Sequence, residues 1–238
     1  MRGLRIFGAL VAGLWLAGCA TQDPSGNNDP FESTNRAVFA FDDKLDQMFF
    51  LPGAEFYVNT VPEPVRDGVH NVLTNLDTPV TLANDFLQGE LDRGGESMMR
   101  LAINTTVGVG GIFDVATKIG IPYHKEDFGQ TLAVWGVPEG PYLVLPLLGP
   151  DPPRDLAGGV VDIFLDPTTY IQLREHTLWS GARGFLGSLD ARAANIDTLK
   201  EVRATSVDYY ATIRSLYRQN RQNEIRNGKT DIENLPNY

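Results

Sequence analysis

Residues 101–121 read LAINTTVGVGGIFDVATKIGI, an apolar run interrupted at Gly108, Gly110, Gly111 and Gly120. The glycines do not form a nucleotide-binding loop, because Phe113 takes the third glycine position of G-x-G-x-x-G and no Gly-Lys-Ser/Thr follows. Asp114 and Lys118 argue against a simple membrane span. Two interpretations stay open: a soluble helical core, or membrane-embedded helices that approach closely at small residues. The same three-residue glycine spacing recurs at Gly181, Gly184 and Gly187.

The amino terminus, MRGLRIFGALVAGLWLAGCA, has the features of a secretory signal, with Arg2 and Arg5 ahead of an apolar stretch. The only cysteine of the chain, Cys19, follows Leu-Ala-Gly, and residues 16–19 resemble the bacterial lipobox. By that resemblance, residues 1–18 are removed and Cys19 carries a diacylglycerol thioether and an amide-linked acyl chain. Each buried methylene contributes about 0.8 kcal/mol, so three chains anchor the protein firmly. The alternative is an ordinary signal peptide with a chance cysteine.

The mature chain is strongly acidic. Without Arg2 and Arg5 it has 18 basic and 30 acidic residues, a formal charge of −12. Such a surface repels nucleic acids and anionic lipid head groups. Contact with a membrane must therefore be apolar. With Cys19 acylated, no thiol remains for disulfides or metal binding.

Helices are the main predicted element, so the predicted fold class is mostly α. Asp29 suits an N-cap, Pro30 the first helical position and Glu32 the third. We expect this helix over 30–49, with Leu51-Pro52-Gly53 ending it.

Prolines and glycines are expected to divide the middle of the chain. We expect short helices, the best over 90–104, separated at Pro62, Pro64, Pro79, Gly89 and Gly94-Gly95. Residues 128–149 are rich in glycine and proline and fit neither a regular helix nor a central strand throughout. A hairpin or proline-shaped loop is expected around 138–141.

Helical periodicity returns in the last third of the chain. Three helices are predicted there, over 177–194, 196–205 and 207–226, with Gly228 ending the last. We expect one helical domain over 29–227, a flexible lipidated tether at 19–28 and a disordered tail at 228–238. After Cys19, no window has the roughly eighteen uninterrupted apolar residues of a spanning helix.

Catalytic and metal motifs are missing. The three histidines, His70, His124 and His176, are too far apart for ligand spacing, and loop or solvent-facing positions are expected. There is no G-x-S-x-G elbow, and Asp127-Phe128-Gly129 lacks the other kinase motifs. The sequence predicts no enzyme, no metal site and no cofactor.

Four segments and Cys19, in this order, resemble the VacJ/MlaA family of outer-membrane lipoproteins. The segments are DPFESTNRAVFAFDDKLD (29–46), VRDGVHNVLTNLDTPVTLANDFLQGE (65–90), RLAINTTVGVGGIFDVA (100–116) and EDFGQTLAVWGVPEGPYLVLPLLGPDPPRDLAGGVVD (126–162). After about residue 175 only the helical character agrees. The resemblance implies a ring-like, mostly helical protein in the periplasmic leaflet of the outer membrane, with an amphipathic channel. Ala20, in place of aspartate, agrees with outer-membrane sorting in known lipoproteins.

The function implied by the resemblance is phospholipid transport. Family members work with a trimeric porin, remove mislocalised phospholipids from the outer leaflet and pass them to a soluble periplasmic lipid carrier, which maintains lipid asymmetry. The alternatives are a structural lipoprotein that scaffolds porins without moving lipid and a lipid-modifying enzyme.

Site residues follow from the resemblance and from residue type. The channel candidates are Asn104, Thr105, Thr106, Gly108, Gly110, Gly111 and Asp114, together with the 128–149 loop. Arg100 and Lys118 are candidates for contact with lipid head groups, although a surface ion pair explains either one. Phe31, Phe41 and Phe49 are expected either in acyl chains or in the core.

Overall fold

The computed structural model describes residues 28–170 and 176–229. The predicted signal peptide, Cys19, all but the last residue of the tether and tail residues 230–238 lie outside the described residues. The elements follow in the order α2 (Glu32–Leu45), η1 (Asp46–Phe50), α3 (Leu51–Thr60), α4 (Glu63–Gln88), α5 (Leu91–Thr106), α6 (Val115–Lys118), α7 (Phe128–Val134), β1 (Val144–Leu145), β2 (Gly149–Pro150), α8 (Pro153–Leu165), η2 (Pro167–Tyr170), α9 (His176–Ala194), α10 (Ile196–Thr205) and α11 (Tyr209–Ile225).

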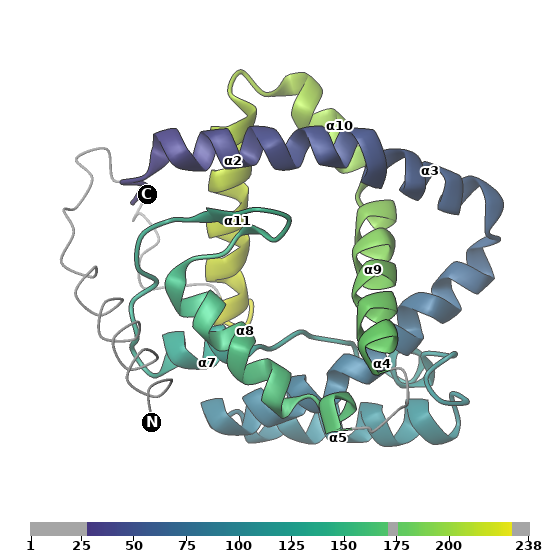
Figure 1. The fold of residues 1–238 in the computed structure, drawn as a ribbon. Helices are drawn as coiled ribbons and strands as arrows, with labels where there is room; N and C mark the ends of the chain where they lie inside the picture. Colours follow the sequence, from purple (N-terminus) through teal and green to yellow (C-terminus); the bar gives the residue numbers. More distant parts are fainter. Residues whose placement is uncertain (1–27, 171–175, 230–238) are drawn as a thin grey trace, which may run out of the picture.

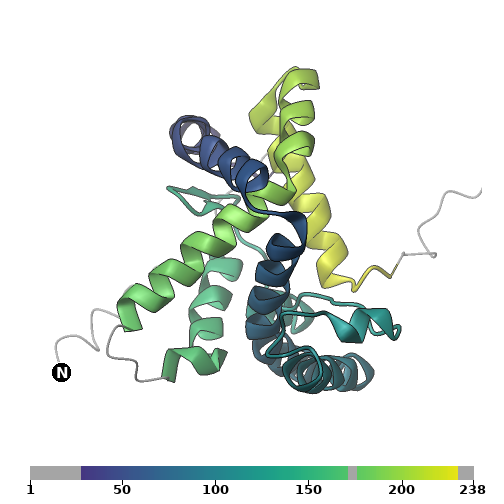
Figure 2. The same ribbon diagram turned by 90° about the vertical axis from the view of Figure 1, so that its right-hand side faces the viewer.

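The helices form the sides of a ring-like frame (Figure 1). In this view α2 and α3 run along the top, α9 stands on the right, α4 and α5 lie along the bottom, and α7, α8 and α11 make the left side. Seen from the side of α9, that helix runs obliquely across the frame (Figure 2). It packs against both α3 and α4, so the late helices close the frame onto the early ones.

Two arginines of α9 pair with acids on the neighbouring sides of the frame. Arg183 lies 2.6 Å from Asp77 of α4 and 2.6 Å from Asp166. Arg192 donates to Asp46 through Nε at 2.7 Å and Nη2 at 2.9 Å. Bidentate arginine–carboxylate pairs constrain direction as well as distance. These pairs therefore help to set where α9 stands in the frame.

The first helix differs from its predicted bounds at both ends. Phe31, not Asp29, occupies the N-cap of α2, because the Asp29 carboxylate is buried and accepts hydrogen bonds from the Asn35 side chain and from Tyr210 and Arg214 of α11. Leu51-Pro52-Gly53 does not end the helix. Pro52 has no N–H for an i−4 bond, and the chain passes through the π-helical turn η1 and continues as α3.

Proline does not divide the second segment as predicted. Pro79 lies inside the long helix α4, and Pro64 sits in its first turn, where its missing N–H costs nothing. Gly89 ends α4 in the left-handed region, with φ of 80°. Gly94-Gly95 does not separate helices as predicted, because it lies inside α5. The helix predicted over 90–104 is confirmed as α5.

Of the two structures expected around 138–141, the loop is confirmed, and a hairpin follows it along the chain. Residues 128–134 form α7, and β1 pairs antiparallel with β2 in register Val144 to Pro150. The turn between the strands is at 146–148 instead of 138–141. The three late helices are confirmed as α9, α10 and α11, the last starting at Tyr209 because the Asp208 side chain caps it.

Most of the buried side chains in the frame are polar, and many large apolar side chains are exposed. Its buried polar residues include Asn35, Asn75, Thr81, Asn84, Asp85, Ser97, Arg100, Gln130, Thr131, Arg154, Asp155, Arg214 and Arg221. Large apolar side chains stand exposed, among them Met48, Phe56, Leu91, Val107, Phe113, Trp135, Leu148, Phe164, Leu178 and Phe185. Phe31, Phe41 and Phe49 belong to this outer set, at 46%, 52% and 62% exposed. In a water-soluble domain, large apolar side chains are mostly buried and charged or polar side chains are mostly exposed, which is the reverse of this distribution.

No helix among the described residues combines the length and the apolar character that crossing a membrane requires.

Candidate functional site

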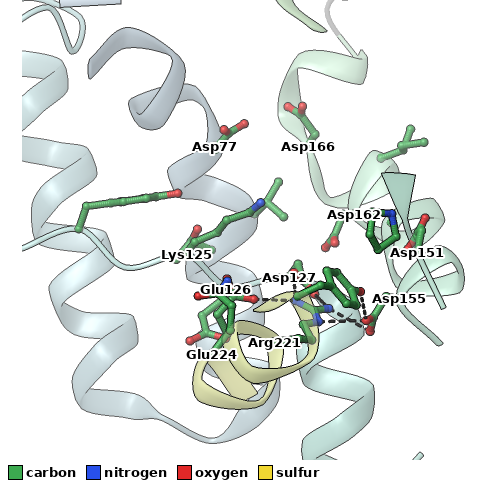
Figure 3. Close-up of a pocket in the computed structure, with 18 residues that line it drawn as sticks. Asp77, Lys125, Glu126, Asp127, Asp151, Asp155, Asp162, Asp166, Arg221 and Glu224 are labelled. Carbon is green, nitrogen blue, oxygen red and sulfur yellow. Dashed lines mark hydrogen bonds and ion pairs between the residues drawn. The ribbon is translucent and has the colours of Figure 1, made fainter. Parts of the chain in front are cut away.

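A pocket of about 590 Å³ lies between α4, the loop before α7, α8 and α11. Its lining residues are Asp77, Val80, Thr81, Tyr123, Lys125, Glu126, Asp127, Pro150, Asp151, Asp155, Gly159, Asp162, Ile163, Asp166, Tyr217, Asn220, Arg221 and Glu224. In Figure 3, Asp77 on one side and Asp162 and Asp166 on the other face the same space. Segments more than a hundred residues apart thus share one polar surface.

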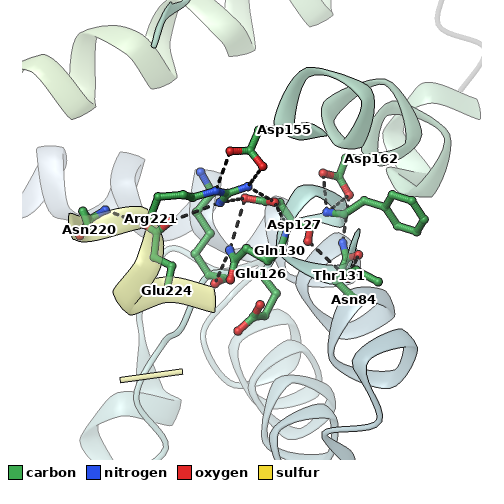
Figure 4. Close-up of polar contacts among 12 residues, drawn as sticks. Asn84, Glu126, Asp127, Gln130, Thr131, Asp155, Asp162, Asn220, Arg221 and Glu224 are labelled. Carbon is green, nitrogen blue, oxygen red and sulfur yellow. Dashed lines mark hydrogen bonds and ion pairs between the residues drawn. The ribbon is translucent and has the colours of Figure 1, made fainter. Parts of the chain in front are cut away.

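Arg221 of α11 is the centre of the polar contacts (Figure 4). Its Nη1 and Nη2 each donate to Asp127 at 2.7 Å, and its Nε donates to Asp155 at 3.0 Å. Burial favours the neutral acid at Asp127, but Arg221 outweighs it and lowers the pKa of Asp127 to about 2. Both carboxylates are therefore charged at neutral pH, and one guanidinium joins α7, α8 and α11.

Asp127 also builds the start of α7. Its carboxylate accepts from the Gln130 backbone N–H at 2.9 Å, the usual N-cap bond. Asp127-Phe128-Gly129 thus has a structural explanation that needs no magnesium. The glycine is needed for packing, because a methyl group at Gly129 would lie 2.6 Å from Arg221 and 2.7 Å from Asp155.

A second polar cluster holds α7 to α4 and α8. Asn84 of α4 donates to Asp162 at 2.9 Å and accepts from the Thr131 hydroxyl at 2.8 Å. The backbone N–H of Phe128 also donates to Asp162, at 3.0 Å. Asn84 and Thr131 are completely buried, and each finds its partners inside the protein. Such satisfied networks are the condition for burying polar groups at all.

His124 lies in a third cluster. It stands in the loop before α7, one of the two kinds of position expected for the histidines, although its side chain is mostly buried. Its Nε2 lies 3.0 Å from Asp85, and the Ser97 hydroxyl donates to the same carboxylate at 2.6 Å. His70 of α4 pairs with Asp190 of α9 at 2.8 Å. A hydrolase triad joins acid and serine through opposite ring nitrogens. Here Asp85 and Ser97 meet the same nitrogen, so the cluster does not have triad geometry.

The pocket carries an excess of negative charge. Eight lining residues are acidic, and two, Lys125 and Arg221, are basic. Arg93, Arg154 and Arg183 approach lining carboxylates from outside the pocket. Eight carboxylates therefore face five cations. Burial, with the charge of Asp155 second, raises the pKa of Asp151 to about 6.

Most channel candidates from the sequence form a compact turn between α5 and α6. Asp114 caps α6 and accepts from Arg100 and Asn104, both at 3.0 Å. Burial opposes ionisation, but bonds from Thr117, Arg100 and Asn104 together lower the pKa of Asp114 to about 2. Arg100 is 2% exposed and also donates to the Ile121 carbonyl, so it is not a surface ion pair. Lys118 stands exposed.

The remaining candidates surround this turn. Thr106 donates to Ala102 in its own helix at 2.6 Å, and Thr105 accepts from Asn75 at 3.1 Å. None of the candidates of the 100–118 segment lines the pocket described above. Their role in a channel stays a prediction.

The glycines of the sequence patterns divide into two groups. Gly108 is packed against the backbone of Asn104, and Gly111, with φ of 94°, lies against the Asn75 side chain. Gly110 has φ of 71° and open space around it. The second predicted set, Gly181, Gly184 and Gly187, has no atom within 4 Å of an added methyl group. The idea that this set allows close helix approach is therefore wrong, and close approach occurs at Gly129 and Gly158 instead.

Sequence reasoning missed the pocket residues of α8 and α11. A signal was present: Tyr210, Arg214, Tyr217 and Arg221 recur at helical spacing and share one face of α11. The predicted helix over 207–226 had no site residue assigned to it. Among the described residues, no group of three or more His, Cys, Asp or Glu side chains has the geometry to hold a metal ion.

Comparison with known proteins shows the family to which the chain belongs. The family model of the MlaA lipoproteins matches residues 27–224, which include every lining residue of the pocket. The chain belongs to the MlaA lipoprotein family. The predicted VacJ/MlaA resemblance is confirmed, and the match extends through α9 and α10 and nearly to the end of α11, where the sequence alone supported only helical character.

Individual MlaA relatives support the same assignment. The chain is 32% identical to the intermembrane phospholipid transport system lipoprotein MlaA of Haemophilus influenzae, over 99% of this chain and 97% of the relative. An uncharacterized protein of Rickettsia prowazekii is 36% identical over 83% of this chain and 78% of its own length. A chain from a solved structure, described as the structural basis for maintenance of bacterial outer membrane lipid asymmetry, is 31% identical with a TM-score of 0.75. That match covers 83% of this chain and 98% of the solved one, so the helical MlaA fold is shared.

Proposed function

We propose that this lipoprotein lies in the periplasmic leaflet of the outer membrane and moves mislocalised phospholipids out of the outer leaflet. The observation that carries the proposal is the inverted polarity of the frame. Exposed side chains such as Phe56, Leu91 and Leu178 are 69%, 69% and 68% exposed, while Asn84, Asp85 and Thr131 are completely buried. Removing an apolar side chain of this size from water contributes about 1.5–3 kcal/mol. The exposed apolar side chains are therefore more stable in contact with lipid acyl chains than with water.

The polar interior supports the same environment. In hydrocarbon, backbone and side-chain polar groups must pair within the protein. The clusters around Arg221 and Asn84 do this, and Arg214 donates to the completely buried Asp29 at 2.5 Å. The exposed apolar side chains and the hydrogen-bonded polar clusters together support embedding of the ring in one leaflet, with the Cys19 lipid as a second anchor.

The pocket supports transport rather than anchoring alone. A phospholipid that crosses a bilayer unaided must take a charged head group through hydrocarbon, which is very costly. A charged pocket of about 590 Å³ at the inner side of an apolar frame removes that cost. We propose that it forms part of an amphipathic passage, with no bond made or broken and hence no enzymatic step. The MlaA relatives are named for intermembrane phospholipid transport, which agrees with this role.

Two further proteins complete the proposed pathway. A trimeric porin holds the ring in place, and a soluble periplasmic lipid-binding protein accepts the extracted lipid. The alternative, a porin scaffold without transport, needs the exposed apolar side chains but not the charged pocket. The pocket is therefore where an experiment separates the two functions.

Gly159 of α8 offers a direct test. It lines the pocket, and an added side chain meets no atom within 4 Å at its first carbon. Gly159→Trp should fill the pocket and reduce transfer of labelled phospholipid from porin-containing liposomes to a lipid-binding acceptor. Gly95→Trp, at an equally open helical glycine outside the pocket, is the matched control. Unchanged transfer by a folded Gly159→Trp protein would leave the scaffold function as the better explanation.

The 101–116 segment remains a proposed second part of the passage. Thr106 is exposed and bonds only within its own helix, so Thr106→Trp leaves the fold intact. Reduced transfer at normal protein abundance supports this segment as lining, and wild-type transfer removes it from the passage.

A further inference from the structure

Two carboxylates of the pocket have no cation bonded to them. Asp162 accepts from the Phe128 N–H and from Asn84, which are neutral donors. Within the described part of the chain, no hydrogen bond or ion pair engages the Asp151 side chain. Asp127, Asp155 and Asp166, by contrast, each pair with an arginine. The excess negative charge of the pocket is therefore concentrated at Asp151 and Asp162, on either side of α8's first turns.

One cation of the pocket is also unpaired. Among the described residues, no partner bonds the Lys125 ammonium, whereas Arg221 is fully engaged by Asp127 and Asp155. The charge of Lys125 acts on Asp162, where it opposes the rise in pKa caused by burial. Figure 3 shows the Lys125 nitrogen directed toward the space that Asp162 faces. The pocket thus offers one free positive group beside two free negative ones.

Aromatic rings complete the lining. Tyr123 and Tyr217 both contribute to the pocket, from the loop before α7 and from α11. Tyrosine faces attract ammonium groups, most strongly where water is excluded. Burial raises the pKa of Tyr123 to about 12, so its ring stays neutral at physiological pH.

We propose that the pocket binds the zwitterionic head group of an aminophospholipid, with the ammonium at Asp162 and the phosphate at Lys125, while the free carboxylate of Asp151 adds to the negative potential of the pocket. This inference rests on the proposed transport function and adds a preference among its substrates. An anionic glycerol-type head group brings a phosphate but no ammonium, so it leaves Asp162 unmatched and adds a repulsive charge near Asp151. A zwitterionic head group matches both Lys125 and Asp162 with an opposite charge and adds no net charge.

Competition between two lipids with identical acyl chains tests the preference. The full-length acylated protein is incubated in detergent with equimolar phosphatidylethanolamine and phosphatidylglycerol, and bound lipids are counted by native mass spectrometry. We expect phosphatidylethanolamine to be enriched about fivefold, which corresponds to about 1 kcal/mol. Asp151→Asn with Asp162→Asn should bring the ratio close to one. Asp67→Asn with Asp92→Asn removes two exposed charges outside the pocket and should leave the ratio unchanged.

A second variant guards against loss of folding. Because Asp151 bonds no described partner, Asp151→Lys leaves the packing intact and should favour phosphatidylglycerol. Equal binding of the two lipids by the wild type, or an unchanged ratio in both pocket variants, overturns the head-group proposal while total lipid binding still supports transport. If neither lipid binds, the transport function fails and the preference falls with it. If soluble phosphoethanolamine displaces the lipid at equal concentration, the site belongs to a free amine and not to a lipid.

Discussion

Gly158 of α8 lies directly against Gly129 of α7, and a methyl group on Gly158 would stand 2.6 Å from the Gly129 α-carbon. Only two glycines permit this approach of the helices. It brings Asp155, near the start of α8, and Asp127, at the cap of α7, within reach of the same Arg221 side chain. The geometry of the charged pocket thus depends on a contact between two residues without side chains.

Gly158→Ala should destabilise the protein by about 1–3 kcal/mol, the usual cost of overpacking. The new methyl would meet backbone atoms, which cannot turn away. The neighbouring Gly159 has open space, so Gly159→Ala should be neutral or stabilise the helix by up to about 1 kcal/mol. Thermal unfolding of both variants measures the difference. Equal melting temperatures would show that the two helices do not need this contact.

Arg221→Met should cost about 3–5 kcal/mol, because it leaves the half-buried Asp127 without a cation and the buried Asp155 with Arg154 alone. Lys200→Met breaks an exposed pair with Glu55 and should cost no more than about 1 kcal/mol. Denaturant unfolding in detergent compares the two. A similar small loss in both variants would contradict the central role of Arg221.

Acid should destabilise the fold through Asp127 and Asp114. Their pKa values of about 2 in the folded chain lie below the ordinary value of 3.8. A carboxyl group with a lowered pKa stabilises the folded state above its unfolded pKa, and this contribution is lost as the pH falls from about 4 to about 2. Asp127→Asn should therefore reduce stability at pH 7 and weaken its dependence on pH below 4. Unfolding free energies measured between pH 7 and pH 2 provide the test.

Asp151 should act with the opposite sign. Its folded pKa of about 6 is above the ordinary 3.8, so its charge opposes folding at high pH and the opposition disappears as the pH falls through 6 toward 4. Asp151→Asn should raise stability at pH 8 and have little effect at pH 4. Melting temperatures of wild type and variant at the two values check this. A constant difference between them would mean that the carboxyl group titrates normally.

Cys19→Ala should release the protein from the membrane fraction and abolish lipid transfer in cells, because the predicted acyl chains supply one of its two membrane contacts. Fractionation and measurement of outer-leaflet phospholipid give the readout. Ala20→Gly, which keeps the cysteine, is the matched control. A fully active, released Cys19→Ala protein would refute the anchoring prediction.

Helical content and most helix positions could be predicted from local pattern. The periodicity of 90–104 and of the last third of the chain corresponds to α5, α9, α10 and α11. Local pattern failed where a tertiary contact replaced the local one. Asp29 does not cap α2, because its buried carboxylate pairs with Arg214, which lies 185 residues away. Pro79 stayed inside α4, because packing of the long helix outweighs one missing backbone bond.

The family, the helical class and the acidic character of the chain can be predicted without a structure, since motifs, periodicity and charge are local properties of the sequence. Which face of each helix is buried depends on how the helices pack in the folded chain. Periodicity marks an apolar face but does not say whether water or lipid lies against it. The pocket was equally beyond local pattern, because Asp77, Asp151 and Arg221 meet only when the frame closes. The charge of the pocket therefore depends on contacts between distant segments of the chain, not on the spacing of residues along it.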